Sequence, residues 1–85
     1  MLDVRPTPNP DAVKIVLPKR LFERPLVVAR PQDAGTLPLA QELIAIEGVR
    51  DLFFLHDFVT VARRPGVAWE PLLAQVERVL RAHLG

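Results

Sequence analysis

Residues 38–64, PLAQELIAIEGVRDLFFLHDFVTVARR, are the stretch on which the fold depends. Between Pro38 and Ile46 the apolar residues recur at spacings that place them on one side of a helix. We expect Thr36 to cap this helix and Gly48 to end it, because glycine tolerates the left-handed conformation at a helix end. The strand that follows is then joined to the helix almost without a loop, which predicts close packing between the two.

Two strands are predicted next, at residues 49–55 and 58–63, with His56 and Asp57 at the turn between them. The turn lacks glycine, so a strained two-residue turn and a three-residue turn are both open. Residues 52–55, LFFL, put bulky side chains on both faces of the first strand. One face must pack against the helices. For the other we expect intramolecular cover, with an exposed aromatic binding patch as the alternative.

The chain after this hairpin has the pattern of one long amphipathic helix. Pro71 must lie in its first turn, where a missing N–H group costs nothing. We expect Trp69 to anchor the helix in the core. The apolar residues at helical spacing are Trp69, Leu72, Leu73, Val76, Val79, Leu80 and Leu84.

The chain before residue 38 is rich in proline and has the pattern of short extended segments. Its strand candidates are residues 2–5, 13–17 and 26–29. Between the first two lies Thr7-Pro8-Asn9-Pro10, in which each proline holds the preceding residue in an extended conformation. We expect a rigid turn here. The alternative is a preformed surface on which the Thr7 hydroxyl and the Asn9 amide contact a partner.

Length and composition indicate one small domain, residues 1–85, with 49% apolar residues and a formal net charge of +1. The absence of cysteine excludes a disulfide framework, a thiolate zinc site and a cysteine-ligated iron–sulfur cluster within this chain. The N-terminus lacks the pattern of a signal peptide, and no apolar run approaches the ~20 residues that span a bilayer. We therefore expect a cytoplasmic protein that does not enter the membrane.

No constellation of catalytic residues is visible. The chain contains no serine, its glycines are isolated, and its threonines have no arranged base. We expect no enzymatic activity and no cofactor. A weak alternative is direct binding of iron or another metal through Asp11, His56 and Asp57, whose side chains are suitable ligands but have no metal-site spacing.

Nucleic-acid binding is a third hypothesis, carried by the basic residues Lys19, Arg20, Arg24, Arg63 and Arg64. Glu23 interrupts the first group, and no aromatic residues alternate with these cations to stack on bases. The near-neutral net charge is also unlike that of a protein that neutralises many phosphates. We expect these residues to be solvated loop side chains, so nucleic acid is not among the expected partners.

Several segments, in order along nearly the whole chain, resemble the N-terminal domain of the Nfu (NifU-like) iron–sulfur scaffold proteins. They are TPNP at 7–10 followed by Lys14, PLA at 38–40, IEGV at 46–49, FF at 53–54, DFVTV at 57–61, and Trp69. The resemblance implies an α+β fold of two layers, with two helices packed on one face of a largely antiparallel sheet. Longer members have a second domain whose Cys-x-x-Cys holds the cluster, so this chain resembles the stand-alone bacterial form.

The same resemblance implies an accessory or protein-interaction role in iron–sulfur cluster assembly, without a cluster on this chain. The expected partner is a protein, either an assembly factor or an apo-client. We expect the contact surface to combine Thr7, Asn9 and Lys14 with the outer face of the sheet near Phe54 and Phe58.

Overall fold

The computed structural model describes residues 3–84, so Leu2 of the first predicted strand and both ends of the predicted domain lie outside the described residues. The elements are β1 (Asp3–Pro6), β2 (Ala12–Val16), β3 (Phe22–Val28), the 3-10 helix η1 (Pro31–Ala34), α1 (Pro38–Ile44), β4 (Val49–His56), β5 (Phe58–Arg63) and α2 (Trp69–Leu84).

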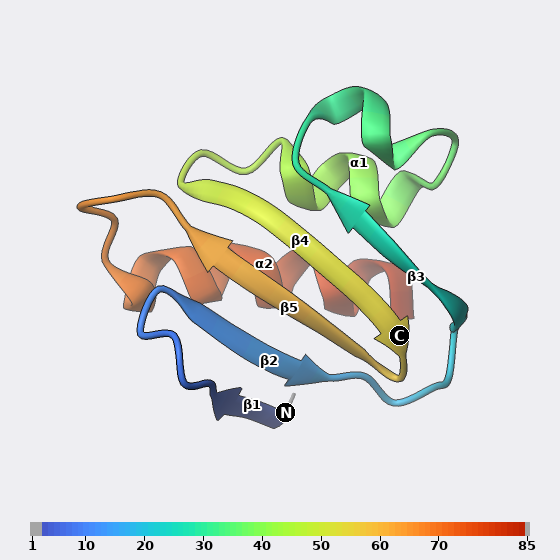
Figure 1. Ribbon diagram of the computed structural model, residues 1–85, viewed down its shortest axis with the longest axis horizontal. Coiled ribbons are helices and arrows are strands. Elements are labelled where there is room, and N and C mark those ends of the chain that lie inside the picture. Colours follow the sequence, from blue (N-terminus) through green and yellow to red (C-terminus); the bar gives the residue numbers. More distant parts are fainter. Residues whose placement is uncertain (1–2, 85) are drawn as a thin grey trace.

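The strands form one five-stranded sheet in the order β1-β2-β5-β4-β3, and every neighbouring pair is antiparallel. The β4–β5 hairpin lies in the middle, with β2 beside β5 and β3 beside β4. Figure 1 shows α2 crossing behind the strands. The buried residues of α1, α2 and the sheet form one core cluster, so both helices pack on the same side of the sheet. The predicted α+β fold of two layers is confirmed.

The core lies between the sheet and the two helices. Residues two apart in a strand point to the same face, and this alternation turns one side chain in two toward the helices. Each fully buried aliphatic or aromatic side chain contributes about 1.5–3 kcal/mol relative to an exposed one. The fully buried core includes Ile15, Leu52, Phe54, Val59 and Val61 of the sheet, Leu43 of α1, and Leu72, Val76 and Leu80 of α2.

The start of α1 differs from the prediction by one residue. The N-cap is Leu37, whose side chain makes no capping hydrogen bond, and Thr36 lies one position further out. Pro38 occupies the first helical position, where its fixed φ favours the helix and its missing N–H would have no partner in any case. The proline therefore sets the start of the helix without a capping side chain.

The predicted helix end at Gly48 is wrong, because α1 stops four residues earlier, at Ile44. A separate turn follows, in which the Val49 N–H donates to the Ile46 carbonyl (3.1 Å). Gly48 lies in this turn with φ +102°, and a Cβ at this position would be 3.0 Å from Cγ1 of Val67. Glycine is required here by the turn and by the close approach of Val67, not by the helix.

The β4–β5 hairpin has the predicted two-residue turn, because Leu55 pairs with Phe58 across it. His56 has φ +50°, in the left-handed region that glycine or asparagine usually occupies. The connection between β2 and β3 wraps around this turn: the Leu17 N–H donates to the Asp57 carbonyl (2.6 Å), and the Leu21 N–H donates to the His56 carbonyl (2.9 Å).

Helix α2 is amphipathic, as its spacing predicts. Pro71 lies in its first turn, Leu72, Val76 and Leu80 are buried, and Arg81 pairs with Glu77 on the outer side (2.6 Å). Within residues 3–84, no helix combines the length and the apolar character needed to cross a membrane.

Candidate functional site

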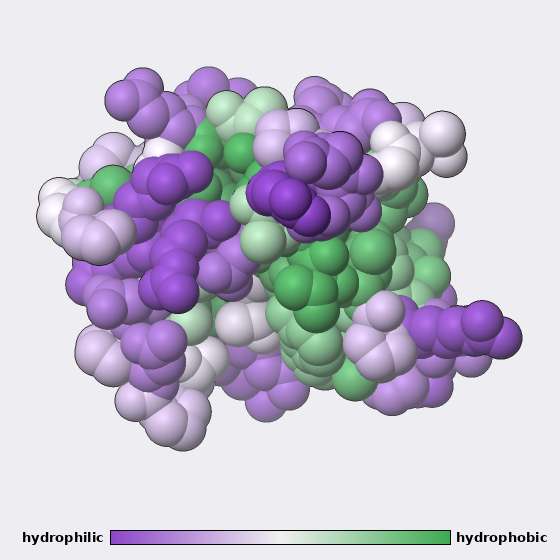
Figure 2. Space-filling view, turned by 45° about the horizontal axis from the view of Figure 1, so that its top comes forward, coloured by the Kyte–Doolittle hydropathy of each residue, from purple (hydrophilic) through white to green (hydrophobic). Residues whose placement is uncertain are grey.

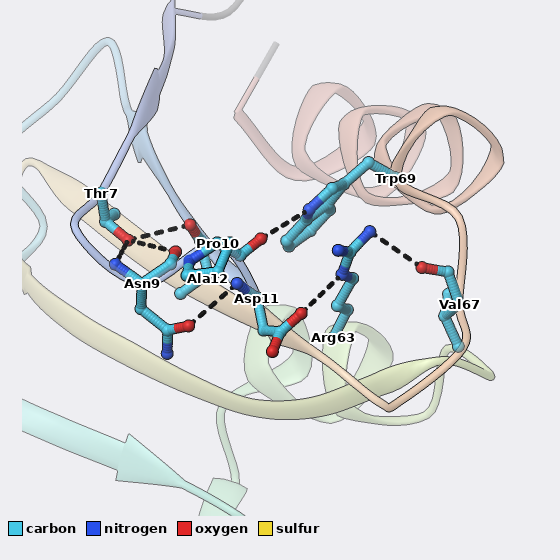
Figure 3. A network of polar contacts seen from close by, with 8 residues as sticks. All are labelled: Thr7, Asn9, Pro10, Asp11, Ala12, Arg63, Val67 and Trp69. Atoms are coloured by element: carbon cyan, nitrogen blue, oxygen red, sulfur yellow. Dashed lines mark hydrogen bonds and ion pairs between the residues drawn. The ribbon is translucent and has the colours of Figure 1, made fainter.

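Residues 7–11, which we call the proline loop, form a turn held by its own hydrogen bonds (Figure 3). The Asn9 N–H donates to Thr7 Oγ1 (3.1 Å), and the Thr7 hydroxyl lies within donating distance of the Asn9 carbonyl (2.8 Å) and the Ala12 carbonyl (3.0 Å). Asn9 Oδ1 accepts from the Asp11 N–H (2.9 Å). The Thr7 hydroxyl and the Asn9 side-chain oxygen therefore both make hydrogen bonds within the loop.

Three side chains, which we call the Trp69 clamp, fix the proline loop to α2. Trp69 Nε1 donates to the Pro10 carbonyl (3.1 Å), and the Arg63 guanidinium lies over the indole ring at 4.9 Å from its centroid. Arg63 also donates from Nε to Asp11 Oδ1 (3.1 Å) and from Nη1 to the Val67 carbonyl (3.0 Å). Figure 3 shows these groups converging from the proline loop, the end of β5 and the start of α2.

Trp69 thus only partly matches its predicted role as a core anchor. It packs against the core cluster but is half-buried, and its indole N–H bonds to the loop. The signal missed in the sequence is that a tryptophan N–H needs an acceptor when the ring is covered.

The face of the sheet opposite the helices is the open face. It carries an apolar patch formed by Val16, Val27, Phe53, Leu55 and Phe58. Val27 is 60% exposed, and the other four side chains are half-buried. Figure 2, an oblique view of the side that faces the reader in Figure 1, shows a continuous hydrophobic area bordered by hydrophilic surface. The expected intramolecular cover is wrong: β1 and β2 join the sheet edge-on, and both helices lie on its other side.

Lys14 and Phe58, two of the predicted contact residues, meet on this open face. The Lys14 ammonium lies 4.4 Å from the centroid of the Phe58 ring, and the Phe53 and Phe58 centroids are 6.1 Å apart. An ammonium over an aromatic face is attracted by the ring quadrupole, which holds Lys14 over Phe58. The pair forms a surface with both apolar and cationic character.

Phe54, by contrast, does not belong to this surface. It is fully buried on the helix side of the sheet and packs against Phe22, with ring centroids 4.7 Å apart. The reason is register: Phe54 pairs with Val59 and so shares its face, whereas Phe53 pairs with Thr60 and points outward. Alternation in the sequence separates the two phenylalanines onto opposite faces, but the register that decides which one faces outward depends on the turn length, which the sequence left open.

The basic residues do not form one patch. Lys19 and Arg20 lie beside the hairpin turn, because Leu17 and Leu21 bond to its carbonyls, whereas Arg63 ends β5 at the opposite end of the sheet. Six residues of strand separate the two ends by ~20 Å. Arg63 is in addition paired with Asp11.

The residues of the predicted metal site are separated in the same way. Asp11 pairs with Arg63 at one end of β5, and His56 and Asp57 form the turn at the other. Within residues 3–84, no group of three histidine or carboxylate side chains is placed to hold a metal ion.

Comparison with known proteins identifies relatives over nearly the whole chain. The chain is 35% identical over 83 residues to a NifU-like protein of Schizosaccharomyces pombe, which covers 92% of this chain and 31% of the relative. It is 38% identical over 63 residues to the human mitochondrial NFU1 iron-sulfur cluster scaffold homolog (73% of this chain, 25% of the relative). It is also 30% identical to Conserved virulence factor C of Staphylococcus haemolyticus (94% and 22%). The chain therefore spans less than a third of the length of these curated relatives.

A solved structure supports the same relationship. The crystal structure of protein SAV1430 from Staphylococcus aureus superposes with a TM-score of 0.80 at 27% identity, covering 91% of this chain and 93% of that one. The family described as scaffold protein Nfu/NifU N terminal matches residues 2–85. The chain belongs to the Nfu/NifU N-terminal family.

Proposed function

We propose that this chain is a non-catalytic accessory module of iron–sulfur cluster assembly, which binds a protein partner in the cytoplasm and carries no cluster itself. The observation that carries the proposal is its membership of the Nfu/NifU N-terminal family combined with a sequence that has no cysteine. Iron–sulfur clusters in proteins are held mainly by cysteine thiolates. A role in assembly then depends on contacts with other proteins.

The open face is the surface that best supports such contacts. Exposed apolar areas bordered by polar residues are typical of protein interaction sites. Here Lys14 and Phe58 hold each other in place, and the proline loop, at the other end of β2 from the apolar patch, is fixed by the Trp69 clamp. A surface that is already ordered loses little entropy when a partner binds.

The test is affinity capture from the source organism with the purified chain immobilised, followed by identification of the bound proteins by mass spectrometry. We expect iron–sulfur assembly factors or apo-clients to be enriched with the wild type. Lys14→Glu should deplete them, because it reverses a charge in the middle of the open face. Arg78→Glu, the same charge change on the exposed side of α2, is the matched control. Captured proteins without any iron–sulfur relationship would refute the proposed function.

A further inference from the structure

The open face is graded along its strands, from apolar at the hairpin end to small and polar at the other. Strand pairing aligns its side chains in rows across the sheet. The rows, from the hairpin end, are Val16, Phe58 and Leu55; then Lys14, Thr60, Phe53 and Val27; then Ala12, Ala62 and Asp51. The apolar patch therefore occupies the first two rows.

Cations outnumber carboxylates around this hairpin end. Lys14 lies within the patch, Lys19 and Arg20 follow β2 in the connection that bonds to the hairpin turn, and Arg24 lies on the edge strand β3. The carboxylates of this region are Glu23, which pairs with Arg20 (3.9 Å), and Asp57 of the turn. Among residues 3–84, the ion pairs include neither Lys14 nor Lys19 nor Arg24.

The edge strand β1 does not change this balance. Arg5 donates to Asp3 Oδ2 (2.7 Å), and this hydrogen bond holds the pKa of the Asp3 carboxyl below its ordinary value. Both groups are therefore charged at neutral pH, and their charges cancel. The hairpin end keeps a surplus of positive charge beside its apolar rows.

We infer that the hairpin end of the open face binds a short protein segment in which acidic side chains flank aromatic or aliphatic ones. The inference rests on the proposed function and specifies the chemistry of the partner at that surface. The apolar side chains of the segment would pack on the Phe53–Phe58 rows, and its carboxylates would lie near Lys14 and Lys19. Charge complementarity of this kind steers association and selects the partner.

The size of the patch favours a segment over a second copy of this chain. Two rows across four strands cover on the order of 250 Å² of sheet, from the usual strand and residue spacings. A stable dimer buries ~800 Å² on each partner. In a face-to-face dimer, moreover, two surfaces with the same surplus charge would oppose each other.

The geometry also disfavours a single-stranded nucleic acid on this face. Bases bind such sheets by stacking on exposed aromatic rings. Here the Lys14 ammonium already lies over the Phe58 ring, and the Phe53 ring is half-buried and tilted by 40° relative to Phe58.

The test uses a library of displayed peptides with twelve random residues, which span ~40 Å when extended. Peptides that bind the immobilised chain are selected from this library. We expect the enriched peptides to combine acidic residues with Phe, Leu, Ile or Trp.

Binding of a synthetic enriched peptide should shift the NMR signals of the apolar patch and weaken several-fold as salt screens the charges. Lys19→Glu and Val27→Glu should each reduce its affinity about tenfold, the effect of ~1.4 kcal/mol. Both positions are exposed, so these variants should fold, which circular dichroism checks. Arg78→Glu should leave the affinity unchanged.

Four results would overturn the inference: no enrichment, enrichment without acidic residues, tighter binding of single-stranded RNA than of the peptide, or a dimer in ultracentrifugation that Val27→Glu dissociates. These results differ from a failure of the proposed function. If the selection fails but affinity capture still recovers iron–sulfur assembly proteins, the function stands and the partner contacts another surface. If acidic peptides bind but the captured proteins have no iron–sulfur relationship, the function fails.

Discussion

Trp69 connects parts of the molecule that lie far apart in the sequence. Its indole N–H reaches the Pro10 carbonyl, and Arg63 stacks on its ring while bonding to Asp11. The proline loop, the end of β5 and the start of α2 are therefore held together by one aromatic side chain.

We predict that Trp69→Phe lowers the free energy of unfolding by ~1 kcal/mol, the net value of one hydrogen bond. Phenylalanine keeps an aromatic ring under Arg63 but cannot donate to Pro10. Trp69→Ala, which also removes the packing, should cost ~3 kcal/mol or more. Because Trp69 is the only tryptophan, urea unfolding must be followed by circular dichroism. Equal stability of Trp69→Phe and the wild type would show that the Pro10 bond contributes nothing.

Gly48 and Gly66 form a matched pair that separates backbone strain from steric contact. Both have positive φ, +102° and +81°, but only at Gly48 would a Cβ meet another side chain, 3.0 Å from Val67 Cγ1. We expect Gly66→Ala to cost ~1–2 kcal/mol for the backbone conformation alone. Gly48→Ala should cost ~1–3 kcal/mol more, because overpacking is added. Urea midpoints of the two variants measure the difference, and equal losses would rule out the contact with Val67.

At the scale of elements, periodicity predicted α1, α2 and the hairpin, but not all of their boundaries. The residues after Ile44 kept the apolar pattern of a helix, although the chain there turns toward β4. Strand β3 begins at Phe22, earlier than predicted. The prediction began the strand only after Pro25, because a proline within a strand argues against it. The sheet tolerates this proline since β3 is an edge strand with an irregular register between Phe22 and Leu26.

The hairpin turn contains a residue with a strained backbone conformation, and this strain can be tested. His56 has φ +50°, and its Nδ1 is buried without a hydrogen-bond partner among the described residues. Asparagine adopts this conformation more readily than most residues, whereas a β-branched side chain resists it. We predict that His56→Asn raises the free energy of unfolding by ~0.5–1 kcal/mol and that His56→Val lowers it by ~1–2 kcal/mol. Thermal unfolding of both variants checks this. If they had the same stability, the turn would not depend on the positive φ.

At the scale of the whole molecule, the fold class could be predicted, but the placement of the candidate sites only in part. The residues of the two alternative sites, basic and metal, are not brought together for one reason: they lie at opposite ends of β5, and this depends on the pairing of β2 with β5. The order of the strands in the sheet decides how far apart residues such as Asp11 and Asp57 lie, and no local sequence pattern predicts that order. Lys14 and Phe58 were predicted to lie in one contact surface because both belong to segments that resemble the Nfu N-terminal domain.

We predict that the purified chain acquires no cluster when it is incubated anaerobically with iron, sulfide and a thiol reductant and then desalted. It has no thiolate to hold one. The measurement is visible absorption together with iron content, and a scaffold domain that carries Cys-x-x-Cys, treated in parallel, is the control. Stoichiometric iron with cluster absorption on this chain would contradict the proposed function.

The strand order has a consequence for how the chain is made. The β4–β5 hairpin, which lies between β2 and β3 in the sheet, follows β1, β2 and β3 in sequence, so the ribosome releases the strands on both sides of the hairpin before the hairpin itself. Until Arg63 has left the exit tunnel, β2 has no β5 to pair with, and pairs such as Ala12 with Ala62 close very long loops. The nascent chain therefore exposes unpaired strand edges until β5 has emerged, and a chaperone that covers those edges during this interval would protect the chain from aggregation.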